Sequence, residues 1–351
     1  MSDTTVERGA AAKIHTDAQR LLEIRGLKKY FPIEKGFLRR VVGQVKAVDD
    51  VNLYINKGET LGLVGESGCG KTTLGRCIVR AIEATEGEIL FRLPDGRVVD
   101  LARLDKKELR SNRKYIHMIF QDPYSSLNPR MTVLDIIAEP IKYNKIAGGE
   151  QLVERVKELM KVVGLEIKHL KRYPHAFSGG QRQRIGIARS LAPNPNLIVC
   201  DEAVSALDVS IQAQILNLLQ DLQQEFDLTY LFVAHDLSVI EHISDRVVVM
   251  YVGKVVELTA TEELFINPKH PYTEALLSAV PKTDPENKME RIILPGEVAN
   301  PGNPPSGCYF HPRCTYAEEV CRSVSPQWRE VALEHFVSCH RAHELTLEGV
   351  E

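Results

Sequence analysis

The residues with the clearest chemical meaning form a glycine-rich loop, Gly65–Thr72, with the sequence GESGCGKT. The loop matches the pattern G-x-x-x-x-G-K-[ST] at every fixed position. In this pattern backbone N–H groups converge on phosphate oxygens, and the following helix directs the positive end of its dipole at them. Lys71 can reach the β- and γ-phosphates of a nucleotide, and the Thr72 hydroxyl can bind Mg²⁺. The residues expected to contact the nucleotide are Gly65, Glu66, Ser67, Gly68, Cys69, Gly70, Lys71, Thr72 and Thr73.

Two acidic residues follow an apolar run later in the chain, where Leu197–Cys200 is followed by Asp201 and Glu202. An aspartate at the end of a buried strand can hold Mg²⁺ beside a phosphate loop. Glu202 would then lie next to the γ-phosphate, where a carboxylate can orient and deprotonate the attacking water. An apolar run ending in two acids is common, so this assignment depends on the phosphate loop that precedes it.

The elements that must position these residues can be read from the hydrophobic pattern. Thr60–Val64 is a short apolar strand that leads into the glycine loop, and Thr72–Ile82 reads as the helix after it. Further strands are predicted at Tyr115–Phe120, Leu197–Cys200 and Tyr230–Ala234, helices at Gln181–Leu191 and Ile211–Phe226, and hairpins at Glu88–Val99 and Arg246–Leu258. Strands that alternate with helices predict an α/β domain with a mainly parallel sheet.

Composition and hydrophobic pattern divide the chain into three parts. Residues 1–20 are polar and are expected to form a mobile tail. Residues 21–265 form the main domain, and apolar residues at helical spacing predict a helical subdomain at about residues 125–175. From residue 266 to 351 frequent prolines interrupt any long element, which predicts a loop-rich C-terminal extension.

Composition excludes several classes of protein. The net charge is −3, so no overall positive field favours nucleic acid. No apolar run approaches the ~18 residues that a membrane span needs, and the first twenty residues lack a signal-peptide core. We therefore expect a protein of the cytosol, and any membrane spans it works with would belong to other subunits.

Two further motifs and three single residues resemble features of the ATP-binding-cassette (ABC) ATPases. Phe177–Gln181 reads FSGGQ and resembles the signature motif of that family. Single residues resemble the glutamine of the Q-loop, the switch histidine and the aromatic that stacks on adenine. The matching positions are Ser178, Gly179, Gly180 and Gln181 for the signature, Ser205, Ala206, Leu207 and Asp208 for the D-loop, Gln121, His235 and Tyr30.

The resemblance implies a P-loop NTPase (RecA-like) core at residues 21–265, with an antiparallel β subdomain and a helical subdomain. In this family two cassettes enclose two ATP molecules, and the signature of one chain completes the site of the other. The implied catalytic residues are Glu202, His235, Gln121 and Lys71, and the implied Mg²⁺ ligands are Thr72, Gln121 and Asp201. The implied activity is hydrolysis of ATP to ADP and phosphate.

Segments outside the core resemble the oligopeptide/dipeptide importer ATPases. They are Gln121–Arg130, His270–Pro281 and Asn303–Cys308. The insert around Phe31–Val45 resembles the F-type subunit, which implies a D-type sister ATPase, two transmembrane permeases and an extracytoplasmic peptide-binding protein. The chain would then be a peripheral protein on the cytoplasmic side of the inner membrane. Import of nickel or oligosaccharide, or a role as a non-transport ABC ATPase, remain alternatives.

Cysteines crowd the end of the chain, with Cys308, Cys314, Cys321 and Cys339 among its last 44 residues. Four thiolates suit tetrahedral zinc or an iron–sulfur cluster. The C-x-x-C pairs typical of structural zinc sites are absent, and the resemblance implies a [4Fe-4S] cluster. His311 and His340 flank the cysteines and could replace one of them. Zinc, or no metal, is the alternative.

Overall fold

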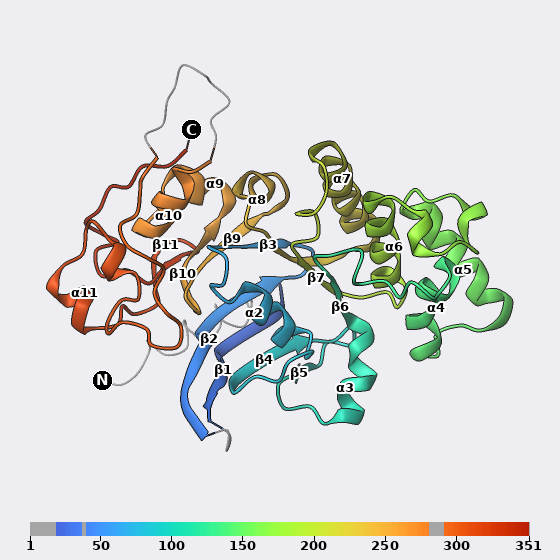
Figure 1. The fold of residues 1–351 in the computed structure, drawn as a ribbon, viewed down its shortest axis with the longest axis horizontal. Coiled ribbons are helices and arrows are strands. Elements are labelled where there is room, and N and C mark those ends of the chain that lie inside the picture. Colours follow the sequence, from blue (N-terminus) through green and yellow to red (C-terminus); the bar gives the residue numbers. More distant parts are fainter. Residues whose placement is uncertain (1–18, 37–39, 281–290, 351) are drawn as a thin grey trace, which may run out of the picture.

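The computed structural model describes residues 19–36, 40–280 and 291–350. Two sheets organise the molecule, one of eight strands and one of four (Figure 1). The predicted α/β class is confirmed. The predicted mobile tail lies outside the described residues except for its last two, and the first strand already begins at Arg20.

The larger sheet has the strand order β11-β12-β10-β9-β3-β8-β7-β6. Five neighbouring strands of this sheet run parallel: β9 (Arg246–Tyr251), β3 (Thr60–Val64), β8 (Thr229–Val233), β7 (Leu197–Asp201) and β6 (Ile116–Ile119). Every residue of β3, β7, β8 and β9 is buried. Strands covered on both faces read as continuous apolar runs, which explains why the sequence pattern located them.

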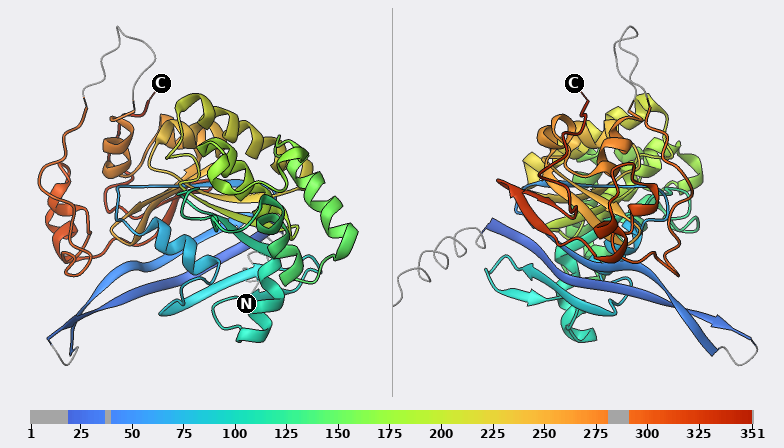
Figure 2. Two further views of the ribbon diagram at one scale, coloured as in Figure 1. Left: turned by 45° about the vertical axis from the view of Figure 1, so that its right-hand side comes forward. Right: turned by 90° about the vertical axis from the view of Figure 1, so that its left-hand side faces the viewer.

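The smaller sheet is antiparallel and lies beneath the larger one. Its strands, in the order β2-β1-β4-β5, are β2 (Arg40–Asn56), β1 (Arg20–Lys35), β4 (Glu86–Arg92) and β5 (Val98–Asp100). The hairpin of β1 and β2 projects well beyond the body of the molecule (Figure 2). Leucines of β3 and residues of β1, β2 and β4 share one buried apolar core, so the two sheets hold each other in place.

The helix after the glycine loop, α2, spans Lys71–Ile78 and lies between the two sheets (Figure 1). It ends four residues earlier than the predicted Ile82. Arg80 adopts a left-handed backbone conformation with φ of 54°, which an α-helix does not continue.

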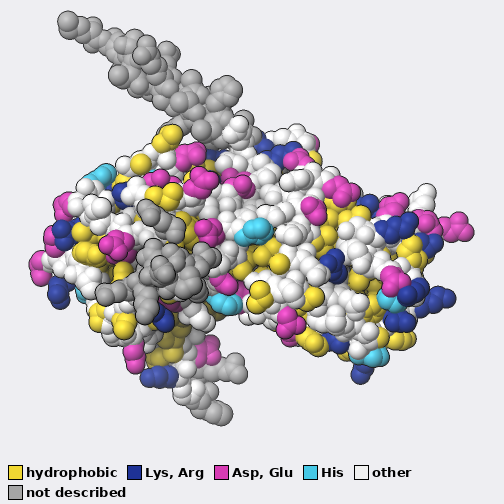
Figure 3. Space-filling view, turned by 90° about the horizontal axis from the view of Figure 1, so that it is seen from above, with side chains coloured by type: hydrophobic (Ala, Val, Ile, Leu, Met, Phe, Trp, Pro, Cys, Tyr) yellow, Lys and Arg dark blue, Asp and Glu magenta, His cyan; other side chains and the backbone are white. Residues whose placement is uncertain are grey.

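A helical lobe stands at the end of the molecule beyond β6. Helices α4 (Val133–Tyr143) and α5 (Gly149–Val162) pack through Ile136, Ile137, Val156 and Leu159 against the core that α6 (Gly179–Leu191) shares. The remaining helices of the main domain are α3 (Lys106–Asn112), η1 (Arg113–Tyr115), η2 (Ile167–His169), η3 (Pro174–Ala176), α7 (Val209–Phe226) and α8 (Leu237–Ile243). Seen from above, acidic and basic side chains are interspersed over the surface (Figure 3).

The C-terminal extension returns to the edge of the larger sheet. Strand β10 (Lys254–Ala260) pairs antiparallel with β12 (His335–Val337), which pairs with β11 (Arg329–Ala332). Two buried side chains meet there, with His335 Nε2 within hydrogen-bond distance of Glu257 Oε1 at 2.7 Å. Helix α9 (Thr261–Ile266) lies at the boundary between the main domain and the extension, and the described part of the extension adds the short helices α10 (Pro271–Leu277), η4 (His311–Arg313) and α11 (Glu319–Ser323). The predicted boundary at residue 265, where prolines become frequent, therefore falls between strands that pair within one continuous sheet.

Candidate functional site

The glycine loop joins β3 to α2 and packs tightly against neighbouring backbone. Gly65 and Gly70 have φ angles of 148° and 111°, in the region that favours glycine. A Cβ atom on Gly65 would lie 2.1 Å from the Met250 carbonyl oxygen, and one on Gly70 would lie 2.0 Å from that of Ala47. Both glycines are therefore required by space as well as by conformation.

Lys71 is buried and its side chain folds back over the loop. Its Nζ donates hydrogen bonds to the carbonyl oxygens of Gly65 at 2.7 Å and Glu66 at 3.1 Å. The ammonium therefore sits at the mouth of the loop, where phosphates would arrive. The adjoining cavity has a volume of about 480 Å³ and is lined by Ala47, Ser67, Gly68, Gly70, Lys71, Thr72, Thr73, Gln121, Glu202 and His235.

Two of the three ligands predicted for Mg²⁺, Thr72 and Asp201, lie together, whereas the Gln121 amide is hydrogen-bonded to Glu202. The Thr72 hydroxyl donates to Asp201 Oδ1 at 2.9 Å, which links the start of α2 to the end of β7. Burial raises the pKa of Asp201, and the hydrogen bond from Thr72 partly offsets that effect. A bound cation would favour the charged carboxylate. A hydroxyl and a carboxylate are hard oxygen donors of the kind that Mg²⁺ takes, so these residues fit the ion.

Three residues predicted to be catalytic lie together, because the side chains of Gln121 and His235 both approach the carboxylate of Glu202. Gln121 Nε2 donates to Glu202 Oε2 at 2.7 Å, and His235 Nδ1 lies 3.4 Å from the same oxygen. They follow β6, β7 and β8, whose carboxyl ends meet at one edge of the parallel sheet. Glu202 has a φ of 49°, a strained conformation for a non-glycine residue. Its backbone N–H donates to the carbonyl oxygen of Val233 at 3.0 Å, and this bond holds the strained residue in place.

The signature motif forms the start of α6. Ser178 caps this helix and makes a reciprocal pair of hydrogen bonds with Gln181, with distances of 3.3 and 3.1 Å. Gly180 packs closely on α7, because a Cβ there would lie 2.5 Å from Ile211 Cγ2. Ser178 is exposed, and none of the described residues that line the phosphate-loop cavity belongs to the signature.

The D-loop lies between these two regions. Ser205 Oγ donates to the Glu202 carbonyl oxygen at 3.0 Å. Leu207 Cδ2 lies 3.5 Å from the position that a Cβ on Gly179 would take. Ala206 and Asp208 complete the turn, and Asp208 is the residue before α7. The segment predicted as the D-loop therefore connects Glu202 with the start of α6.

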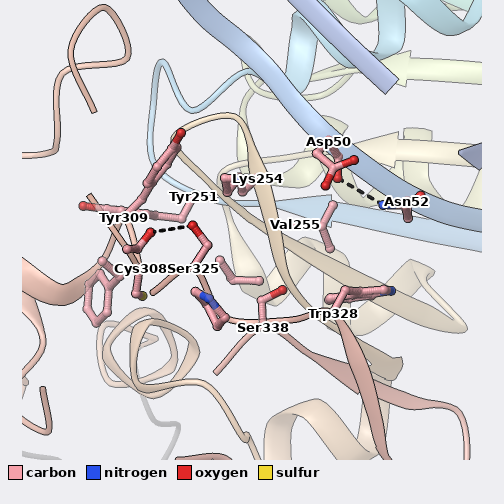
Figure 4. A pocket seen from close by; sticks show the side chains of 14 residues that line it. Asp50, Asn52, Tyr251, Lys254, Val255, Cys308, Tyr309, Ser325, Trp328 and Ser338 are labelled. Atoms are coloured by element: carbon pink, nitrogen blue, oxygen red, sulfur yellow. Dashed lines mark hydrogen bonds between the residues drawn. The ribbon is translucent and has the colours of Figure 1, made fainter. Parts of the chain in front are cut away.

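Tyr30, the predicted adenine-stacking residue, is tied to the C-terminal extension. Its hydroxyl donates to Asp49 Oδ1 at 2.5 Å, and the Tyr309 hydroxyl donates to Asp49 Oδ2 at 2.8 Å. Burial raises the pKa of Asp49, but these two hydrogen bonds and nearby lysines outweigh it and lower the pKa. Figure 4 shows Tyr309 and Trp328 of the extension facing Asp50, Asn52 and Lys254 across a cavity of about 80 Å³. Adenine stacking by Tyr30 stays a prediction.

No pattern in the sequence predicted that the extension would reach the nucleotide site. Two of its residues, Arg313 and Tyr272, contact the glycine loop. Arg313 forms an ion pair with Glu66, and the Tyr272 hydroxyl accepts a hydrogen bond from the Glu66 backbone N–H. Arg313 is next to Cys314 in the sequence, but nothing in that local pattern indicates a partner in the loop.

The four C-terminal cysteines line one small cavity of about 20 Å³, together with His311 and His340. None of them forms a disulfide. Burial raises the pKa of Cys308, Cys314 and Cys339 to about 11. Within the described ranges, no group of three or more His, Cys, Asp or Glu side chains is arranged to hold a metal ion. The predicted iron–sulfur or zinc site is therefore not supported by this geometry.

Across the part of the chain that the structure describes, no helix has the length and apolar character needed to cross a bilayer.

Comparison with known proteins agrees with the site. The family model described as "ABC transporter" matches residues 48–205, and "Oligopeptide/dipeptide transporter, C-terminal region" matches residues 256–321. The oligopeptide transport ATP-binding protein AppF of Bacillus subtilis is 56% identical over 91% of this chain and 97% of its own. A "Probable peptide ABC transporter ATP-binding protein" of Sinorhizobium fredii is 50% identical over 91% and 89%.

A similar solved structure is that of the ATP-binding cassette MJ0796, a dimer in a post-hydrolysis state bound to ADP and Pi. It is 29% identical, has a TM-score of 0.59, and the match covers 68% of this chain and 98% of that one. The residues predicted to bind phosphate and magnesium thus lie together in a chain of which these two relatives match 91%. The chain belongs to the family of ABC transporter ATP-binding proteins, in the group that carries the oligopeptide/dipeptide transporter C-terminal region.

Proposed function

We propose that this chain hydrolyses ATP in a dimer of cassettes and thereby powers the import of di- and oligopeptides through a membrane transporter. The observation that carries this proposal is the separation of the two phosphate-binding elements. Lys71, Thr72 and Glu202 surround the loop cavity, whereas the exposed Ser178 lies outside it. A helix N-terminus that presents free backbone N–H groups can bind an anion. The phosphate loop of the same chain does not bring a phosphate to this one. A second cassette can supply the missing half.

The proposed chemistry uses the residues around the cavity. The loop and Lys71 would bind the phosphates of ATP. Mg²⁺, held by Thr72 and Asp201 with Gln121 nearby, would neutralise charge on the phosphates when bound. Glu202 would orient the attacking water and take its proton. His235, with a side chain that is 57% exposed, can turn toward the γ-phosphate and respond to its loss.

The proposed assembly follows the relatives' names and the family resemblance. It contains a D-type sister ATPase, two permease subunits and an extracytoplasmic peptide-binding protein, with this chain bound at the cytoplasmic face of the membrane. No nucleic acid partner is proposed, because the net charge is −3. Peptide is preferred to nickel or oligosaccharide as cargo because the AppF relative, at 56% identity, is named for oligopeptide transport.

Reconstitution of the native complex tests this function. The subunits that co-purify with the chain are identified, and the complex is inserted into lipid vesicles. Addition of the peptide-binding protein with a peptide is expected to raise ATPase activity several-fold and to drive labelled peptide across the membrane. Vesicles without the binding protein are the control. Stimulation by nickel or oligosaccharide alone would change the cargo, and a preparation that contains no permease would contradict the transport role.

We also propose that the cysteine cavity holds an iron–sulfur cluster. Four cysteines, whose thiolates are soft ligands, line one small apolar cavity. A four-iron cluster is larger than a single zinc ion and suits ligands that are widely spaced along the chain. The spacing of these cysteines, which lacks C-x-x-C pairs, favours iron over zinc. The cluster would stabilise an extension with little regular structure.

Anaerobic purification followed by elemental analysis tests the cluster. We expect roughly four iron atoms and matching acid-labile sulfide per chain. Cys314→Ala is expected to lose iron and to lower the Tm. Cys77→Ala, which alters a buried cysteine of the main core, is the matched control and should retain iron. Zinc in place of iron, or a metal-free protein of full stability, would contradict this proposal.

A further inference from the structure

Arg313 of the extension reaches across the molecule to the phosphate loop. Its Nη1 donates to Glu66 Oε2 at 2.8 Å and its Nη2 donates to Glu66 Oε1 at 3.1 Å, so the guanidinium binds both carboxylate oxygens. The two residues are 247 positions apart in the sequence. The Arg313 side chain is only 8% exposed and that of Glu66 is 28% exposed. A bidentate, charge-assisted ion pair with such low solvent exposure has a well-defined geometry.

The backbone of Glu66 is held by the extension as well. Its N–H donates to the Tyr272 hydroxyl at 2.8 Å. Tyr272, on α10, is fully buried and contacts the rings of Tyr251 and Phe310 at centroid distances of 4.7 and 5.4 Å. This aromatic cluster lies between β9 and η4, so it fixes the distance between the sheet and the segment that carries Arg313. Both the side chain and the main chain of one loop residue are therefore anchored outside the main domain.

Glu66 occupies an electrostatically unusual position. It follows Gly65 directly, and its carbonyl oxygen accepts a hydrogen bond from Lys71 at 3.1 Å. A phosphate loop gathers the most highly charged part of a nucleotide, so a free carboxylate at this position would repel the ligand. The low exposure of the pair keeps solvent from screening that repulsion fully. The Arg313 guanidinium compensates the charge and holds the carboxylate on the side of the extension.

We propose that Arg313 is a positioning residue of the nucleotide site, whose pairing with Glu66 allows a phosphate loop with an acidic residue to bind ATP. The proposal rests on the ATP site described above and does not depend on the cargo. It makes ATP affinity a property of the folded extension as well as of the main domain. It also gives the segment around Cys314 a connection to the nucleotide, because Arg313 is the last residue of η4 and Cys314 follows it.

A double-variant cycle tests the electrostatic role. The full-length chain is titrated with a fluorescent ATP analogue, and the KM and kcat for ATP are measured in the assembled complex. Arg313→Gln is expected to weaken nucleotide affinity and raise KM by on the order of 10-fold, with kcat at saturating ATP little changed. High salt should reduce this defect. In a Glu66→Gln background, the same Arg313→Gln change is expected to alter KM less than about twofold, because no carboxylate remains to be compensated.

Arg341→Gln is the matched control. Arg341 pairs with Glu318 and Glu344 inside the extension and makes no contact with the loop that the structure records. It should leave KM unchanged, and thermal unfolding of every variant is compared. An equal loss of affinity from Arg313→Gln in both backgrounds would overturn the proposal, since it would mark a purely structural role. An unchanged KM in the wild-type background would overturn it too. Absence of nucleotide binding by the wild-type chain would instead refute the ATP site itself.

Discussion

Glu202→Gln is expected to lower ATP turnover by about 10²–10⁴-fold while ATP still binds. The substitution keeps the size of the side chain and an oxygen that can accept the hydrogen bond from Gln121, now 2.7 Å from Glu202. An amide cannot take a proton from water at neutral pH. The attacking water would stay neutral, and the closed dimer of cassettes would accumulate with ATP bound. Phosphate release and retained nucleotide are measured in the assembled complex.

The matched control is Glu241→Gln, which removes an exposed carboxylate from α8. It should leave both turnover and nucleotide retention unchanged. Wild-type turnover by the Glu202→Gln complex would remove Glu202 as the general base. Loss of ATP binding would instead show that Glu202 acts in binding rather than in proton transfer.

Gly179→Asp is expected to reduce the turnover of the assembled complex by roughly 10²-fold or more without weakening ATP binding to the isolated chain. Gly179 is the first residue of α6, where backbone N–H groups can receive a phosphate. An aspartate there would occupy this anion site and repel the γ-phosphate that a partner cassette presents. The loop cavity of the same chain has no lining residue in the described signature, so its own ATP affinity should be kept.

The structure indicates that this variant folds. A Cβ on Gly179 would meet Leu207 Cδ2 at 3.5 Å and the Tyr124 hydroxyl at 3.9 Å, which are ordinary contacts. An acidic side chain at a helix N-terminus is favourable by about 0.3–1 kcal/mol. Gly179→Ala, which adds the Cβ without the charge, is the control and should retain turnover. If Gly179→Asp weakened binding to the isolated chain, the signature would serve its own cassette, and the proposed dimeric site would be wrong.

Much of the main domain could be predicted because its strands are short, fully buried and apolar. The runs at Thr60–Val64 and Leu197–Cys200 correspond to β3 and β7 almost residue for residue. The ends of helices were harder to predict, as the early end of α2 at Ile78 illustrates. The return of β12 to the edge of β10 was not predicted, because a three-residue strand has too few positions to show an alternating pattern.

The three residues predicted to be catalytic lie close together for a topological reason. Gln121, Glu202 and His235 each follow a predicted strand, and the carboxyl ends of parallel strands meet at one edge. This topology explains why they converge, whereas the sequence indicated Gln121 and His235 through the family resemblance. The sequence did not indicate the left-handed conformation of Glu202, with φ of 49°, since glutamate has no intrinsic preference for it.

The phosphate loop itself was determined by the sequence. Its residues are contiguous in the sequence, and the groups that would bind phosphate are mostly backbone N–H groups. Its glycines mark the positions where the backbone takes a positive φ or packs closely. The contacts that fix the loop from outside were decided by tertiary structure alone. Arg313 and Glu66 are 247 residues apart, and Tyr309 and Asp49 are 260 apart. The extension that carries Arg313 and Tyr309 has little regular structure, so no periodicity in its sequence defines its path. Only packing on β9, β10 and β2 brings those side chains to the nucleotide site.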